Sequence, residues 1–370
     1  MSILPVKAAV TIAAAVLLLA TGCAPSTPDP TPSPSNPSSS PTPTATAEAL
    51  SAPQPVLDAL CSDILPSSAV GAAYPGGVTE VDLAESIMGA DPTISPTYAV
   101  QSLGGIACEY SNGEPFSAKR GSNPAYVGVR VVVLPNADSQ WNKLIDYYGP
   151  DVEGLNCSES EPLFCTFSGF VSGAWIDVTA IGAVSAATVD TLAADAVAAI
   201  GAAGKGAGPW APPVGTTALP ADCAGVVSDA DVQALLGAPL PVVATLAAGG
   251  WSIEAAALEN WGGPRCMWRY TDSDFGVGSL QTLPGGAWAW AEAAEFLTVP
   301  SAPEELDVTG LAVGDEAWLR CADDGSECLI DLILGGNWLQ AHLWADQGER
   351  SYDQRAGAEA LAAAVVARLG

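Results

Sequence analysis

Positive charge is scarce in this sequence. Its 12 Lys and Arg residues stand against 41 Asp and Glu residues, which gives a formal net charge of -29 at pH 7. A field of that sign repels the phosphate backbone of DNA or RNA, so the composition argues against nucleic-acid binding. Acidity of this degree is instead suited to keeping an exported protein soluble and monomeric.

Histidine is almost absent, and that absence restricts catalytic chemistry. The one histidine is His342, and the chain has no Gly-x-Ser-x-Gly segment that would supply a nucleophilic serine for it. His342 alternates with Trp338, Gln340 and Trp344, which predicts a half-buried position on a strand. The alternative is a metal site or a catalytic dyad built on this histidine.

Long apolar segments are also lacking, and the longest one suits a signal peptide. It covers residues 8–20, follows Lys7, and is shorter than the ~20 residues that a bilayer-spanning helix needs. It ends in Ala20-Thr21-Gly22-Cys23, which resembles a lipobox with Ala20 at the position where Leu, Val or Ile is usual. We therefore predict that residues 1–22 are a lipoprotein signal peptide. The alternative is an ordinary secreted protein in which Cys23 is unmodified.

Acylation of Cys23 would anchor the chain in the cell membrane, on its extracytoplasmic face. Residues 23–53 consist almost wholly of Pro, Ser, Thr and Ala after the cysteine and have no apolar periodicity. Such a segment buries too little to offset its chain entropy, so we expect a disordered, extended tether.

The other eight cysteines fall into two similar sets of four. The sets are Cys61, Cys108, Cys157 and Cys165, then Cys223, Cys266, Cys321 and Cys328. Trp175 lies ten residues after the last cysteine of the first set, and Trp338 lies ten after that of the second. The matching offsets indicate a duplication. We predict a first domain over 54–201, a Gly/Pro linker over 202–220 and a second domain over 221–370.

Two disulfides are expected in each copy, because an even cysteine set in an exported chain favours a disulfide framework. The favoured pairs are Cys157 with Cys165, Cys321 with Cys328, Cys61 with Cys108, and Cys223 with Cys266. Zinc would need short Cys-x-x-Cys pairs, and the sequence has none. We expect no cofactor.

The fold class predicted for each copy is α+β, an antiparallel sheet with helices packed on one face. In the second copy, 316–321 and 328–334 form a hairpin across Asp324-Gly325, and 338–344 forms the next strand. Ala-rich helices are expected at the end of each copy, over 186–201 and 355–370.

A resemblance emerges in the second copy. Cys266-Met267-Trp268 on a strand and the later segment from Val308 to Ala317, with Gly310 and Gly314-Asp315, are similar to a broad family of actinobacterial cell-surface lipoproteins of unknown function. The resemblance implies a lipobox, a Pro/Ser/Thr tether and a disulfide-bonded α+β domain. The first copy lacks the Gly-Asp-x-Ala step, and the family brings no catalytic residues to transfer.

Acidic pairs offer a second enzymatic alternative in the sequence. Asp323, Asp324 and Glu327 lie on one predicted hairpin, and carboxylates of this kind can serve hydrolysis or bind calcium. Asp272 and Asp274 begin like a calcium loop, but the twelfth position is Leu283. We therefore expect no metal site, and solvated loop acids explain these pairs.

Tryptophan is concentrated in the second copy, which suggests where a ligand would bind. Trp288 lies on the helix face of Glu292 and Glu295, opposite an apolar stripe led by Trp290. We predict an exposed Trp288 at the centre of a binding surface, with help from Trp251, Trp261 or Trp344. The alternative is that the second copy simply uses larger core residues.

The sequence as a whole predicts a lipid-anchored envelope protein without enzymatic activity. Its partners would be the membrane, through Cys23, and an envelope protein or glycan. The alternative function is a surface hydrolase that uses carboxylates of the second domain.

Overall fold

The computed structural model describes residues 51–88, 93–116, 123–158, 161–236, 242–244, 252–269, 276–297, 300–344 and 352–370. The predicted signal peptide, Cys23, most of the predicted tether and Trp251 lie outside the described residues. Residues Ala49–Gly370 form one compact unit. Within the described part of the chain, no helix is both long and apolar enough to cross a membrane.

The first half of this unit builds a six-stranded antiparallel sheet in the order β2-β3-β4-β7-β6-β5. Its strands are β2 (Thr79–Glu80), β3 (Ile106–Ser111), β4 (Gly128–Leu134), β5 (Gly154–Ser158), β6 (Phe164–Val171) and β7 (Ala174–Ile181). Its helices are α1 (Cys61–Ile64), α2 (Ser67–Ala73), α3 (Leu83–Met88), α4 (Pro96–Ser102), α5 (Asp138–Tyr148), the 3-10 turn η1 (Pro150–Val152) and α6 (Ala186–Ala202). A separate two-stranded sheet pairs β1 (Leu57–Asp58) with β8 (Gly204–Lys205).

The second half builds a seven-stranded antiparallel sheet in the order β12-β13-β14-β15-β11-β10-β9. Its strands are β9 (Val242–Ala244), β10 (Cys266–Arg269), β11 (Gly276–Leu283), β12 (Glu304–Glu305), β13 (Glu316–Cys321), β14 (Glu327–Leu334) and β15 (Asn337–Trp344). Its helices are α7 (Cys223–Val226), α8 (Asp229–Leu236), α9 (Ile253–Trp261), α10 (Ala287–Ala293) and α11 (Gln354–Leu369).

The two sheets share one strand order. Read from β9, the second sheet places its strands as the first does from β2, and β12 is an addition at the far edge. The matching order is what a duplicated sequence produces, because each copy carries the same alternation of strands, turns and helices. The predicted α+β class with an antiparallel sheet in each copy is confirmed.

The four predicted disulfides are also confirmed. The long pairs are Cys61–Cys108 and Cys223–Cys266, whose Cα atoms lie 5.5 and 5.9 Å apart. The short pairs join directly opposed residues of neighbouring strands, Cys157 with Cys165 and Cys321 with Cys328. Each long bridge ties the first helix of its half that follows the tether or linker to β3 or β10, the strand next to one edge of the sheet, which fixes the helix against the sheet.

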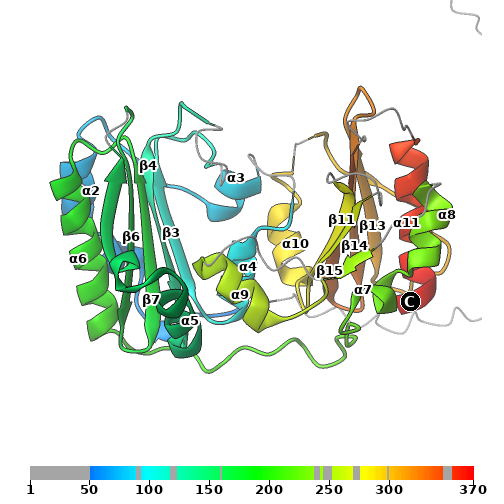
Figure 1. The fold of residues 1–370 in the computed structure, drawn as a ribbon, viewed down its shortest axis with the longest axis horizontal. Coiled ribbons are helices and arrows are strands. Elements are labelled where there is room, and N and C mark those ends of the chain that lie inside the picture. The colour runs from blue at the N-terminus through cyan, green and yellow to red at the C-terminus, as the bar shows by residue number, and fades with distance from the viewer. Residues whose placement is uncertain are drawn as a thin grey trace, which may run out of the picture. The chain divides into compact units, whose positions relative to one another are not determined.

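The outer face of each sheet carries the long C-terminal helix of its own half, α6 or α11 (Figure 1). Each helix begins at a capping residue, Ser185 for α6 and Asp353 for α11. The side-chain oxygen of that residue accepts a hydrogen bond from a backbone N–H of the first turn. Their Ala, Val and Leu side chains pack on alternate strand residues to form two separate apolar cores.

The inner faces are covered as well, by helices that belong to both halves. We call the apolar residues between the two sheets the central cluster; it contains Tyr98 and Trp175 from the first half with Ile253, Trp288 and Trp338 from the second. All seven residues of β4 are buried, as expected for a strand covered on both faces. The predicted domain boundaries stay a prediction, and the structure adds that the two halves share this cluster.

Candidate binding pocket

Trp288 lies inside the central cluster, so the prediction that it is exposed is wrong. Only 3 % of its surface is exposed, and its ring meets Tyr98 edge-on at 5.6 Å between centroids. The sequence pattern correctly gave α10 an apolar stripe, but a helix that lies between two sheets buries the opposite face too. Trp288 therefore joins the two halves, which removes the argument for a binding surface centred on it.

Of the other predicted ligand tryptophans, Trp261 packs against the central cluster that contains Trp288, whereas Trp344 is not part of that cluster. Trp261 is partly buried, donates its indole N–H to the carbonyl oxygen of Pro284 at 2.9 Å, and packs on Trp210. Trp344 is partly buried beside His342 and donates its indole N–H to the carbonyl oxygen of Gly276. Trp251 lies outside the described residues. The structure gives Trp261 a packing partner in the linker and Trp344 one within the second half.

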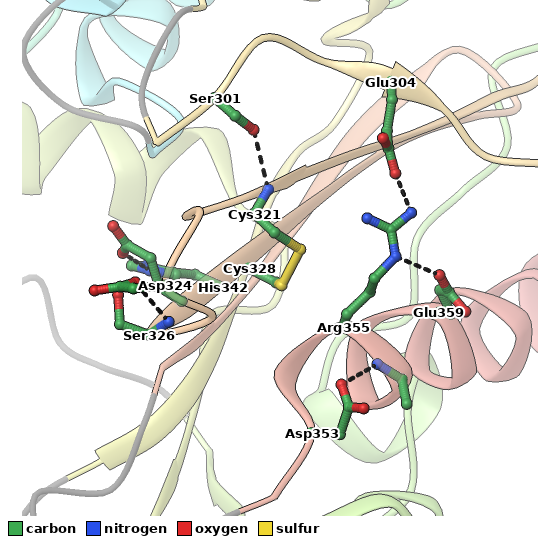
Figure 2. The surroundings of a disulfide bond; sticks show 12 residues. Ser301, Glu304, Cys321, Asp324, Ser326, Cys328, His342, Asp353, Arg355 and Glu359 are labelled. Atoms are coloured by element: carbon green, nitrogen blue, oxygen red, sulfur yellow. Dashed lines mark hydrogen bonds and ion pairs between the residues drawn. A yellow bond between two sulfur atoms is a disulfide. The ribbon is translucent and has the colours of Figure 1, made fainter. Parts of the chain in front are cut away.

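His342 lies on β15 with its ring partly buried, near the Cys321–Cys328 disulfide (Figure 2). Its Nε2 lies 2.7 Å from a carboxylate oxygen of Glu327. The nearby acids have local roles: Asp324 accepts the backbone N–H of Ser326 in the hairpin turn (Figure 2). Asp324 is exposed in this hydrogen-bonded turn.

The predicted acidic pairs do not form a metal site in the part of the chain that the structure describes. No group of three or more His, Cys, Asp or Glu side chains lies there in an arrangement that could hold a metal ion. Asp272 and Asp274 lie outside the described residues.

A buried polar network runs through the second sheet to the first half. Asp331 accepts hydrogen bonds from Arg320, Trp338 and Gln340 at 2.7–3.0 Å, and neither Arg320 nor Asp331 is exposed at all. The side-chain oxygen of Gln340 then accepts the backbone N–H of Ile94, from the first half, at 2.9 Å. The network thus orients the start of α4 against the second sheet.

Asp177 forms the equivalent junction in the first sheet. It accepts hydrogen bonds from Ser168 at 2.6 Å and from the Trp175 indole at 2.7 Å. The pKa of Asp177 is raised to about 7: burial is the largest cause and the charge of Glu254 of α9 adds to it, whereas hydrogen bonds from Ser168, Trp175 and the Ile253 backbone oppose the shift. A helix of the second half therefore begins at a carboxyl group that titrates near neutral pH.

This pKa predicts a pH-dependent stability. Because the folded-state pKa of about 7 exceeds the ordinary value of ~3.9, the folded protein holds a proton that the unfolded chain has lost. As the pH rises from about 4 to about 7, the free energy of unfolding should fall by up to about 1 kcal/mol per pH unit.

Urea unfolding at several pH values measures this effect against two variants. Asp177→Asn should remove this part of the slope, whereas Asp190→Asn, the same charge change at an exposed position of α6, should leave it unchanged. Equal slopes in wild type and Asp177→Asn would contradict the prediction.

A hollow of about 330 Å³ opens where α3 and the end of α4 meet the end of α10. We call it the α3–α10 pocket; its lining includes Asp82, Tyr98, Gln101, Glu292, Glu295 and Phe296. A second hollow of similar size shares Glu295 and Phe296 with it and adds Glu85 and Glu114. Both halves of the chain therefore contribute walls to one acidic depression.

The pocket is built by ordinary local rules. Asp82 is placed by capping α3, because its carboxylate accepts the backbone N–H of Ala84 at 2.8 Å. Ser95 caps α4 in the same way, and α4 carries Tyr98 into the central cluster against Trp288 and Trp338. Glu292 follows one turn after Trp288 on α10 and so emerges from the cluster at its rim.

The electrostatics of the pocket are one-sided. No Lys, Arg or His is among its lining residues, and among the described residues Asp82, Glu292 and Glu295 have no ion-pair partner. Desolvation, and then the charge of Asp82, raise the pKa of Glu292. Burial, followed by the charges of Glu292 and Asp82, raises the pKa of Tyr98.

Two polar atoms at the wall are left without hydrogen bonds. The Tyr98 hydroxyl and the Gln101 side-chain oxygen are buried and have no partner among the described residues. Tyr98 itself is only 3 % exposed. Buried polar groups are nearly always paired, so these two mark a place where a partner of the right chemistry fits.

Sequence reasoning reached part of this pocket and missed the rest. It placed Glu292 and Glu295 on the helix face of Trp288, and these two acids do line the pocket. Tyr98 and Asp82 gave no signal in the sequence beyond their helix-cap context, because their role depends on contact with the other half.

No protein-family model matches the chain, and no curated protein or solved structure shows significant similarity to it.

Proposed function

We propose that this protein is a lipid-anchored, extracytoplasmic binding protein of the cell envelope without enzymatic activity. Cys23 carries the anchor, residues 23–53 tether the folded unit, and the α3–α10 pocket holds the ligand. The resemblance to actinobacterial surface lipoproteins fits this arrangement.

The observation that carries the proposal is the odd cysteine. Eight of the nine cysteines are paired in four disulfides, so Cys23 has no cysteine left to bridge within the chain. Four disulfides also suit an oxidising compartment outside the cytoplasm. A single unpaired thiol directly after Ala20-Thr21-Gly22 is the substrate that lipoprotein acylation requires.

The anchor is tested by changing Cys23 to serine. We expect Cys23→Ser to move the protein from the detergent phase of a Triton X-114 partition to the aqueous phase and into the medium, because the lipid that Cys23 would carry is lost with the thiol. Ser26→Ala, a small change three residues further on, should leave the partition unchanged. A Cys23→Ser protein that stays in the detergent phase as wild type does would contradict the anchor.

Binding is supported by the pocket and its unpartnered polar atoms. The test is capture of components from native envelopes by residues 49–370, the compact unit that contains all four disulfides. A component that wild type retains and a heat-denatured sample loses would support binding. Retention of nothing, in several envelope preparations, would contradict it.

The second candidate function is a surface hydrolase that uses carboxylates of the second half. One observation favours it: Glu292 has a raised pKa and lines the same pocket as Asp82, as a general acid near a second carboxylate would. Hydrolysis of envelope glycans that disappears in Glu292→Gln would favour this function over binding alone.

A further inference from the structure

We propose that the α3–α10 pocket binds an organic cation, a protonated primary amine or a guanidinium on a short apolar chain. The inference rests on the proposed binding function and names the ligand class of the same pocket. It is carried by three features: unneutralised carboxylates, buried polar atoms that lack partners, and an apolar wall.

The carboxylates determine the sign of the ligand. Asp82, Glu292 and Glu295 line one pocket, and no ion pair with a described Lys or Arg neutralises any of them. Asp82 and Glu292 repel each other when both are charged, and the charge of Asp82 is one cause of the raised pKa of Glu292. A cation between them removes this repulsion, whereas an anion would add to it.

The unpartnered atoms determine the hydrogen-bonding type. The Gln101 oxygen only accepts, the carboxylates accept, and the Tyr98 hydroxyl can accept as well. A ligand that fits must therefore bring several donors, which an ammonium group or a guanidinium does. Tyr98 points to the same ligand independently of the acids, because its hydroxyl is buried at the same wall and has no partner among the described residues.

The remaining wall explains the apolar chain. Leu83, Ala84 and Phe296 also line the pocket, so part of its surface suits methylene groups, and an aromatic ring can face a cation. The volume of about 330 Å³ lies at the small end of ligand pockets, which fits a short amine. A bare divalent ion fits less well, since no metal-binding group of three side chains exists in the described part of the chain.

The first experiment is calorimetric titration of the full-length chain in non-ionic detergent with 1,5-diaminopentane. Salt at about 150 mM screens the general attraction of a strongly acidic protein. We expect one saturable site, no binding of the uncharged 1,5-pentanediol, and at least about tenfold weaker binding by Glu292→Gln. Glu153→Gln, the same charge change beside the opposite edge strand β5, should alter the affinity less than about twofold.

Tyr98→Phe separates a ligand role from a structural one. If the hydroxyl has no partner in the free protein, its removal should leave the unfolding midpoint unchanged or higher, while diamine binding weakens about three- to tenfold. A lower midpoint with unchanged binding would show that the hydroxyl serves the fold, and would overturn its assignment to the ligand.

Two further arms identify the source of the cation. Tighter binding of Nα-acetyl-lysine amide than of the diamine would assign the pocket to a protein side chain, and the reverse to a free amine; either result supports the proposal. Lys119 and Arg120 follow Phe116 in segments outside the described residues. If a Lys119→Gln/Arg120→Gln variant binds the diamine about tenfold more tightly than wild type, a cationic side chain of the protein itself occupies the pocket. That result would overturn the proposal of a separate cationic ligand.

Three results would reject the organic cation. Equal binding of the diamine by wild type and Glu292→Gln would show general electrostatic attraction only. Binding of 1,5-pentanediol would show that the pocket does not recognise charge. Displacement of the diamine by calcium chloride at one site would show a metal site. The proposed function fails separately: it falls if Cys23→Ser stays anchored or if residues 49–370 retain no envelope component.

Discussion

Replacing Asp331 with alanine is expected to lower the free energy of unfolding by about 3 to 5 kcal/mol. Arg320 and Asp331 are both fully buried, and the carboxylate receives four hydrogen bonds from Arg320, Trp338 and Gln340. Its removal leaves the Arg320 charge in the core with nothing to compensate it. Chemical denaturation with the disulfides intact measures the loss.

Two comparisons show whether the orphaned charge is the cause. An Arg320→Met/Asp331→Leu double variant removes both charges and should cost less than Asp331→Ala alone. Glu359→Ala breaks the exposed Arg355–Glu359 ion pair on α11 and should cost less than about 1 kcal/mol. If the double variant is less stable than Asp331→Ala, the orphaned charge of Arg320 is not the cause of the loss. The attraction within the buried pair then exceeds the cost of desolvating its two charges.

Replacing Trp288 with alanine is expected to cost about 3 to 5 kcal/mol, because a large side chain leaves a cavity in the middle of the central cluster. The loss should weaken the contact between the halves, since Tyr98 of α4 packs on this ring. Denaturation followed by fluorescence should show one transition in wild type, and an earlier one in Trp288→Ala.

Trp344→Ala is the matched control for this prediction. Trp344 is only partly buried at the end of β15, outside the central cluster, so its loss should cost clearly less. Envelope components captured by wild type should still be captured by Trp288→Ala wherever it remains folded. Loss of capture at full stability would restore Trp288 as a binding residue.

The fold could be predicted well where local pattern decides it. The β13–β14 hairpin follows from Asp324-Gly325 between two apolar runs, and Gly325 adopts the positive φ of 68° that the turn requires. The helices over 186–202 and 354–369 follow from Ala-rich periodicity and a capping residue. The disulfide pairs followed from the repeated spacing of the cysteines.

The candidate site could be predicted only in part. Glu292 and Glu295 were identified by their helix face, but the accompanying Trp288 points into the central cluster. Tyr98 and Gln101 lie about 190 residues earlier in the chain than Glu292, and no periodicity connects positions so far apart. The pocket exists because α4 of one half packs against α9 and α10 of the other, and only three-dimensional contact brings these residues together.

The sequence by itself indicated the duplication, the cysteine pairs, the α+β class of each copy and the strong negative charge. These depend on spacing and composition, which are local or cumulative properties of a chain. The tertiary structure alone decided that the inner faces of both sheets pack on one central cluster, and hence that Trp288 is buried while Tyr98 and Glu292 meet at one pocket. The physical reason is that an apolar stripe indicates only that one face of a helix is buried. The surface that covers this face is decided by the packing of the whole chain.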